Sequence, residues 1–305
     1  MAKLLLIRLL QFPLVLGVIY LLTFLLVWVA PGSPFEHSDR NLDPVALEAL
    51  KKRFHADSKL EFLAYYPRQI IFHHDFGPSL QYKEWSVNDI LRDALPVSIT
   101  LGLFALTIGT IFGVGIGTLA AVKRGGFTDW SGLTLTLVGI SLPSFVSAAV
   151  LLIVFSGKLH WFPVGGWGGI REMILPGVAL SLAPMAYIVR LTRVAMLDVL
   201  GADYVRTARA KGLSKTVVVW KHCLRNAFLP VLSYLGPAAA ATLTGSFVVE
   251  KVFHVPGLGQ HFVNSVLNRD QTLILGTVMV YSVFLLSFNL LVDVGYAFVD
   301  PRIEL

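Results

Sequence analysis

The chain has 305 residues, of which 55% are hydrophobic and 14% are charged, and its formal net charge is +6. Soluble domains carry roughly 25% charged residues, so this composition argues against a water-soluble enzyme. In so apolar a chain, an excess of Lys and Arg is typical of cytoplasmic loops rather than of nucleic-acid binding. Cys223 is the single cysteine, which excludes an internal disulfide.

Six uncharged, apolar stretches predict an all-α polytopic membrane protein with six transmembrane helices. A helix needs ~20 apolar residues to cross ~30 Å of hydrocarbon. The fourth stretch is shorter and requires Arg190 to extend its charge to the interface. A further uncharged run, 252–268, contains two His and a Pro, and we interpret it as an extracytoplasmic loop with a short helix. The predicted spans are 9–35, 94–122, 130–157, 173–189, 226–249 and 271–292.

The distribution of Lys and Arg predicts the orientation. Lys3 and Arg8 precede the first span, which places the N-terminus in the cytoplasm, and an even number of spans returns the C-terminus to the same side. The first apolar stretch is longer than the core of a signal peptide, so we expect it to be retained. The most basic loop lies between spans four and five and carries Arg190, Arg193, Arg206, Arg209, Lys211, Lys215, Lys221 and Arg225.

Small residues and prolines predict details inside the spans. Gly109, Gly113 and Gly117 recur every four residues, a spacing that lets another helix approach closely. Pro143 is expected to kink span three. In the long first loop we expect short helices over about 43–54 and 60–72, and a third that Ser86 caps and that leads into span two. These helices either form a docking platform for a partner or shield the helix ends.

No motif in the sequence predicts catalysis or a bound cofactor. The neighbours His73 and His74 would point about 100° apart on a helix, which suits shared metal coordination poorly. The sequence contains no G-x-x-x-x-G-K-[ST] loop, so the chain cannot hold ATP in that way. We therefore expect no catalytic residue, no metal and no cofactor in this chain.

The segment 203–212 is the most distinctive part of the basic loop. It predicts a short helix in which the small residues Thr207 and Ala208 lie among the basic residues Arg206, Arg209 and Lys211. Gly212 is well placed to end this helix in the left-handed conformation. A second helical piece is expected over about 214–222. From the residues alone, the segment is either a knob below the membrane or a signal that only fixes orientation.

Arg206-Thr207-Ala208-x-x-x-Gly212 resembles the E-A-A-x-x-x-G loop of binding-protein-dependent ABC importer permeases, and His222-x-Leu224-Arg225 stands where that loop has I-x-L-P. Arg206 and Arg225 depart from the general pattern but match the peptide-and-nickel branch. The sequence is most similar to the first membrane subunit of oligopeptide permeases. Further similar motifs are Ala30-Pro31-Gly32-Ser33-Pro34-Phe35, Asp75-Phe76-Gly77-Pro78-Ser79, Val255-Pro256-Gly257-Leu258-Gly259-Gln260 and Asp300-Pro301-Arg302-Ile303.

This resemblance implies an ABC type I importer permease (MetI-like) fold and a non-catalytic membrane subunit that imports oligopeptides. It implies span one within 1–30, a periplasmic helical loop over 31–96, a permease core over 97–298 and a cytoplasmic tail over 299–305. The implied partners are a second permease, two ABC ATPases that bind ATP and Mg²⁺, and an extracytoplasmic peptide-binding protein. The residues implied to couple to an ATPase are Asp203, Arg206, Thr207, Ala208, Arg209, Lys211 and Gly212.

Glu250, Asn289 and Asp293 are polar residues in or beside spans and are candidates for the translocation path. Asp293 could equally pair with a cytoplasmic Arg as a structural lock. The same architecture could import dipeptides or nickel chelates. An ATP-independent secondary transporter or channel would more often show internal repeats and charges at mid-membrane, and a membrane-embedded enzyme would need a polar cluster at one depth.

Overall fold

The computed structural model describes residues 2–29, 59–79, 82, 84–244 and 246–299. The chain forms two compact units. Unit 1 comprises residues 1–5, 99–255 and 285–305, and unit 2 comprises residues 6–98 and 256–284. The predicted helix over 43–54 and the tail over 300–305 lie outside the described residues.

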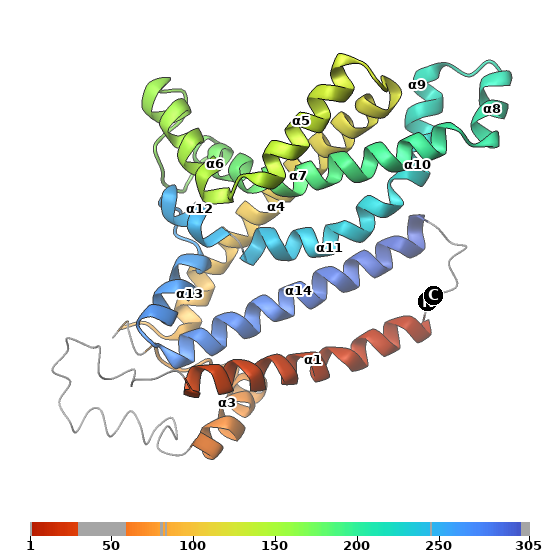
Figure 1. Ribbon diagram of the computed structural model, residues 1–305. Helices are drawn as coiled ribbons and strands as arrows, with labels where there is room; N and C mark the ends of the chain where they lie inside the picture. Colours follow the sequence, from red (N-terminus) through yellow and green to blue (C-terminus); the bar gives the residue numbers. More distant parts are fainter. Residues whose placement is uncertain (1, 30–58, 80–81, 83, 245, 300–305) are drawn as a thin grey trace. The chain divides into compact units, whose positions relative to one another are not determined.

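The regular secondary structure of the described residues consists of helices (Figure 1), and one isolated bridge joins Pro78 and Ser86. The helices are α1 (Ala2–Val29), α3 (Lys59–His73), α4 (Val87–Val122), α5 (Phe127–Ser141), α6 (Ser144–Leu151), α7 (Ile170–Leu200), α8 (Asp203–Ala210), α9 (Lys215–Val217), α10 (Leu224–Ala227), α11 (Leu229–Thr244), α12 (Ser246–Val252), α13 (Leu258–Leu267) and α14 (Gln271–Val299), with π-helical segments η1 (Leu152–Lys158) and η2 (Val218–Cys223).

Four of the described helices, α1, α4, α7 and α14, are long and apolar enough to cross a membrane. A fifth span is formed if α5 and the continuous α6–η1 helix are counted together as one bent pair. The predicted fifth span, 226–249, is divided among α10, α11 and α12, and its apolar helical stretch Leu229–Ala239 is short. The described helices therefore match the predicted stretches in position, whereas span five is not the continuous helix that its composition predicts.

Pro143 breaks its span completely rather than only kinking it. Helix α5 ends at Ser141, Leu142 and Pro143 are extended, and α6 begins at Ser144. The proline ring disfavours helical dihedrals at the preceding residue, and proline has no N–H to continue the ladder. The two halves consequently meet at an angle of 109°.

The start of α4 corrects one expectation. Ser86 does cap a helix, because its Oγ accepts a hydrogen bond from the Asp89 N–H while the Asp89 carboxylate accepts from the Ser86 N–H. However, the helix is not a separate short one. It continues through Pro96 as a single helix of 36 residues; membrane helices tolerate such prolines because neighbouring groups can satisfy the freed carbonyl.

In unit 2, the helix predicted over 60–72 is confirmed as α3 and packs through aromatic side chains. Tyr20 and Phe24 of α1, Phe62 and Tyr66 of α3, and Leu275 of α14 form one buried cluster. The Tyr66 hydroxyl donates to the Thr272 carbonyl oxygen at 2.9 Å. This hydrogen bond fixes α3 to the first turn of α14.

In unit 1, the glycine face of α4 packs against α7, as its spacing predicts. A Cβ atom on Gly113 would lie 2.7 Å from Ile188 Cγ2, and one on Gly117 would lie 2.6 Å from the Val189 carbonyl oxygen. Real Cβ atoms do not approach other atoms this closely, so the two backbones can meet only because these side chains are absent.

We expect Gly117→Ala to lower the stability of the protein by about 2 kcal/mol, since overpacking a tight contact costs 1–3 kcal/mol. The neighbouring Gly115→Ala is the matched control, because a Cβ at Gly115 meets no atom within 4 Å. Thermal unfolding of both variants in the same detergent measures the difference. Equal midpoints for the two would contradict the close α4–α7 contact.

Candidate functional site

The helix predicted over 203–212 is confirmed as α8, which directly follows the long helix α7. Ala202 at its N-cap is extended, and Asp203 occupies the first turn, where a negative charge interacts favourably with the helix dipole. The helix is strongly amphipathic: Val205 is completely buried and Ala208 is 8% exposed, whereas Arg206, Thr207 and Arg209 are exposed.

The buried face of α8 packs on the protein itself. Val205 and Ala208 belong to a cluster that joins α8 to the ends of α4 and α7 and to the segment that follows α8, with Ala121, Met196, Val218, Val219, Cys223 and Ala227 as its other buried members. Ala208, one of the residues predicted to couple to an ATPase, therefore packs inside the protein. Ala208 lies three residues after Val205, and this spacing puts both on one face of the helix.

The end of α8 confirms the predicted glycine cap. Gly212 has a φ of +76°, and its N–H donates to the Arg209 carbonyl at 3.0 Å. The Leu213 N–H donates to the Ala208 carbonyl at 3.4 Å. These two bonds form a Schellman motif, which turns the chain sharply away from the helix.

The chain after α8 forms a second helical piece, as predicted over about 214–222. The Ser214 side chain caps α9 by accepting from the Val217 N–H at 3.4 Å, and the helix continues through η2 and α10. Sequence reasoning did not identify Tyr204, whose hydroxyl accepts a hydrogen bond from Asn226 Nδ2 at 3.0 Å. This bond ties the first turn of α8 to α10 across 22 residues.

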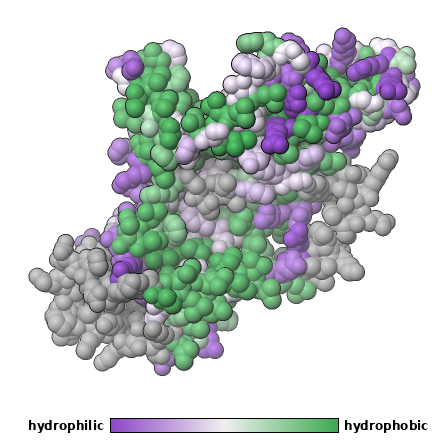
Figure 2. Space-filling view, viewed as in Figure 1, coloured by the Kyte–Doolittle hydropathy of each residue, from purple (hydrophilic) through white to green (hydrophobic). Residues whose placement is uncertain are grey.

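The exposed surface around α8 is basic. Residues 203–227 contain six Lys and Arg against the single carboxylate Asp203, which lies 3.7 Å from the Arg206 guanidinium. Figure 2 shows hydrophilic side chains gathered at the end of unit 1 that carries α8. Cys223 lies buried under this exposed surface, and its burial raises the pKa of the thiol. The thiol therefore stays protonated and unreactive.

A cavity of about 450 Å³ lies beside α8, between this helix and the ends of α4 and α7. Five of its seven lining residues are apolar, and the other two are the charged residues Arg209 and Lys215. The lining residues are Val122, Leu200, Arg209, Leu213, Lys215, Val218 and Val219. The cavity therefore favours an anionic group that is flanked by apolar atoms.

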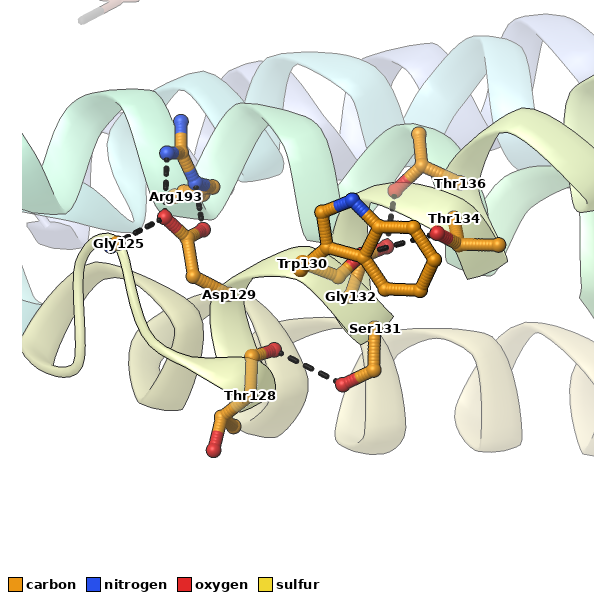
Figure 3. A network of polar contacts seen from close by, with 9 residues as sticks. All are labelled: Gly125, Thr128, Asp129, Trp130, Ser131, Gly132, Thr134, Thr136 and Arg193. Carbon is orange, nitrogen blue, oxygen red and sulfur yellow. Dashed lines mark hydrogen bonds and ion pairs between the residues drawn. The ribbon is translucent and has the colours of Figure 1, made fainter.

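Arg193 lies in α7 and forms an ion pair, so it does not belong to a loop as the sequence suggested. Its Nε and Nη2 donate to Asp129 Oδ1 and Oδ2 at 2.5 and 2.9 Å. The Gly125 N–H donates to Oδ2 at 2.9 Å, and Figure 3 shows the Asp129 carboxylate between these donors. The side chains of Arg193 and Asp129 are 18% and 6% exposed. The pair fixes the start of α5 to α7, and Arg193 lies eight residues before Gly201, the residue that follows α7.

The three path candidates lie on two helices of unit 1. Glu250 is fully buried on α12, and Asn289 and Asp293 are half-buried on α14. The Asn289 side chain lies over Gly236 of α11, where a Cβ atom would collide with its Oδ1. Asn289 thus occupies a point at which α11 and α14 approach closely.

Among the described residues, no group of three His, Cys, Asp or Glu side chains has the geometry to hold a metal ion. His74 adopts a left-handed φ of +52°, and Asp75 accepts a hydrogen bond from the Gly77 N–H at 2.9 Å. The segment that follows α3 is therefore a turn, as its Phe76-Gly77-Pro78 sequence predicts.

Two solved structures share the fold of this chain. An inward-facing structure of the MetNI methionine ABC transporter matches with a TM-score of 0.54 and 15% identity, over 69% of this chain and 96% of that one. A crystal structure of an amino acid ABC transporter with histidines matches with a TM-score of 0.52 and 19% identity, over 68% of this chain and 93% of that one. The chain therefore has the helical ABC importer permease fold.

Sequence relatives match along nearly the entire chain. The dipeptide transport system permease protein DppB of Bacillus subtilis is 44% identical and covers 94% of this chain and 93% of its own. The oligopeptide transport system permease protein OppB of Escherichia coli K12 is 41% identical and covers 100% of both chains. Residues 113–305 match the protein family described as the binding-protein-dependent transport system inner membrane component. The chain belongs to this family of membrane permeases.

Proposed function

We propose that this chain is one of two permease subunits of an ATP-driven peptide importer and that α8 is its coupling helix. The observation that carries the proposal is the division of α8 into two faces. Val205 and Ala208 anchor the helix in the chain's own core, while Arg206, Thr207 and Arg209 remain exposed beyond it. A helix anchored on one face and exposed on the other can bind a partner and transmit its movement.

The partner that fits this surface is an ATPase subunit with acidic groups. Arg206, Arg209 and Lys211 can form charge-assisted hydrogen bonds with carboxylates, and the small Thr207 allows a close approach. The cavity beside α8 can receive an acidic side chain flanked by apolar atoms. In this proposal ATP and Mg²⁺ bind to the two ATPases, and this chain is non-catalytic and holds no cofactor.

The contacts of α8 provide a path for movement into the membrane. When ATP draws the two ATPases together, α8 moves with its ATPase, and the shared cluster of α8 and α7 moves α7. The Asp129–Arg193 pair then carries α5 along with α7. Such rigid-body motion can switch the paired permeases between inward-facing and outward-facing states.

The proposed cargo is an oligopeptide that an extracytoplasmic binding protein delivers. The support is the full-length similarity to the OppB relative, although the DppB relative makes dipeptides, or the nickel chelates of the same branch, the alternative cargo. Glu250, Asn289 and Asp293 remain the proposed path residues. The proposed location is the inner membrane of a bacterial cell with both termini in the cytoplasm.

Purification from mild-detergent extracts tests this assembly. We expect the tagged chain to retain a second permease and two ATPases. If a binding protein is also retained, the ligand of that protein identifies the cargo. Charge reversal at both Arg206 and Arg209 should release the ATPases but keep the second permease. If the chain purifies alone from membranes that contain stable partners, the importer proposal fails and an ATP-independent secondary transporter replaces it.

A further inference from the structure

A second groove in unit 1, of about 540 Å³, lies away from the cavity beside α8. One wall is α4, which contributes Thr110, Ile111, Val114 and Gly115. The other wall is formed by η2 and the start of the returning membrane segment, which contribute Trp220, Leu224, Arg225 and Phe228.

Thr110, Trp220 and Arg225 are the lining residues of this groove that carry polar side-chain atoms. The Thr110 hydroxyl is occupied, because it donates to the Leu106 carbonyl at 2.8 Å. Arg225 is the one charged residue among the lining residues. It is exposed, and within the described part of the chain no oxygen accepts a hydrogen bond from its guanidinium. The neighbouring Trp220 is 49% exposed. The groove thus combines an unpaired cation and an indole with an otherwise apolar lining.

The position of the groove along α4 places it at the membrane boundary. Helix α4 has 36 residues, and its last acidic residue, Asp93, precedes the uncharged stretch that begins at Ala94. About 20 residues cross the hydrocarbon layer, so the far boundary falls close to Gly113, among the residues that line the groove. Arg225 directly precedes the uncharged stretch 226–249. Arg and Trp are both favoured at this depth, where one end of the side chain meets hydrocarbon and the other meets water.

We propose that this groove binds a glycerophospholipid of the leaflet that faces α8. The phosphate pairs with Arg225, the Trp220 indole lies at the level of the glycerol, and an acyl chain follows Ile111 and Val114. A peptide with both termini free would also need an anionic side chain for its ammonium group, and none lines the groove. The proposal requires only that the chain lies in a bilayer and is independent of the docking role of α8.

Native mass spectrometry of the complete transporter, purified in mild detergent and titrated with phosphatidylglycerol, tests this site. We expect Arg225→Gln, which removes the phosphate partner, and Gly115→Leu, which fills the groove, each to reduce retention of one lipid molecule about tenfold. Gly115→Leu keeps the guanidinium, and a Cβ at this position meets no atom within 4 Å, so folding is preserved. The two variants therefore test the charge and the cavity independently.

Matched controls distinguish this site from general contact with lipid. Lys221→Gln removes an exposed neighbouring charge outside the groove, and Gly17→Leu adds the same side chain at an open position of α1. Both should retain the lipid. Equal retention by all four variants, or equal loss, overturns the proposal. A disulfide between Ile111→Cys and a cysteine in the second permease also overturns it, because a protein would then occupy the groove.

Discussion

Replacing Gly212 with glutamate is expected to abolish transport while the chain still inserts into the membrane in normal amounts. A Cβ at Gly212 meets no atom within 4 Å, so the side chain itself disturbs nothing inside the protein. The φ of +76° costs a non-glycine residue roughly 1–2 kcal/mol, which loosens the Schellman turn. The new carboxylate also enters the basic face that we propose binds acidic groups. Uptake of labelled peptide into cells, with the amount of chain in the membrane as reference, measures the effect.

Gly212→Ala is the matched control for this prediction. It places a Cβ atom on the same backbone, with the same φ of +76° and the same open surroundings, but it adds no charge at the end of α8. The two variants have similar backbone strain, so retained uptake in Gly212→Ala and lost uptake in Gly212→Glu assign the loss to the new carboxylate on the α8 surface. Normal uptake in Gly212→Glu would contradict the coupling role.

Removing the Asp129 carboxylate is expected to destabilise the protein more than any other single change considered above. Asp129→Asn leaves the Arg193 guanidinium largely enclosed with an amide in place of its carboxylate, and an enclosed charge that loses its partner is costly. We expect the midpoint of thermal unfolding in detergent to fall by at least about 5 °C. The double variant Asp129→Asn/Arg193→Met should lose less than the sum of the single variants, because it removes both charges.

The exposed pair Asp203–Arg206 provides the control. Its side chains are 97% and 77% exposed, and the shortest distance is 3.7 Å. Such pairs contribute little to stability, so Asp203→Asn should lower the midpoint much less than Asp129→Asn does. An equal midpoint for Asp129→Asn and the wild type would show that the Asp129–Arg193 pair does not hold α5 to α7.

Helix α8 shows how much of the local structure could be predicted from the sequence. Local rules are sufficient to predict the helix over 203–212 and the left-handed Gly212, because capping depends on neighbouring residues alone. Which face of the helix turns inward depends on what it meets. Ala208 and Thr207 are both small, yet only packing in the cluster that also contains Met196 and Val218 decides that Ala208 is buried and Thr207 exposed.

The membrane-spanning helices show the same difference between what local rules predict and what long-range packing decides. Apolar stretches and glycine spacing predicted where helices lie and that α4 presents a tight face, because bilayer thickness and side-chain size act locally along the chain. The continuity of α4 through Pro96 and the pairing of Arg193 with Asp129 were decided by the tertiary structure. Each depends on a partner or a neighbouring helix far away in sequence, and the groove at Arg225 forms only where α4 and η2 meet. The sequence by itself determined the membrane-spanning class, the family and the position of the basic segment that forms α8, whereas long-range packing determined which side chains of this helix are buried and which are exposed.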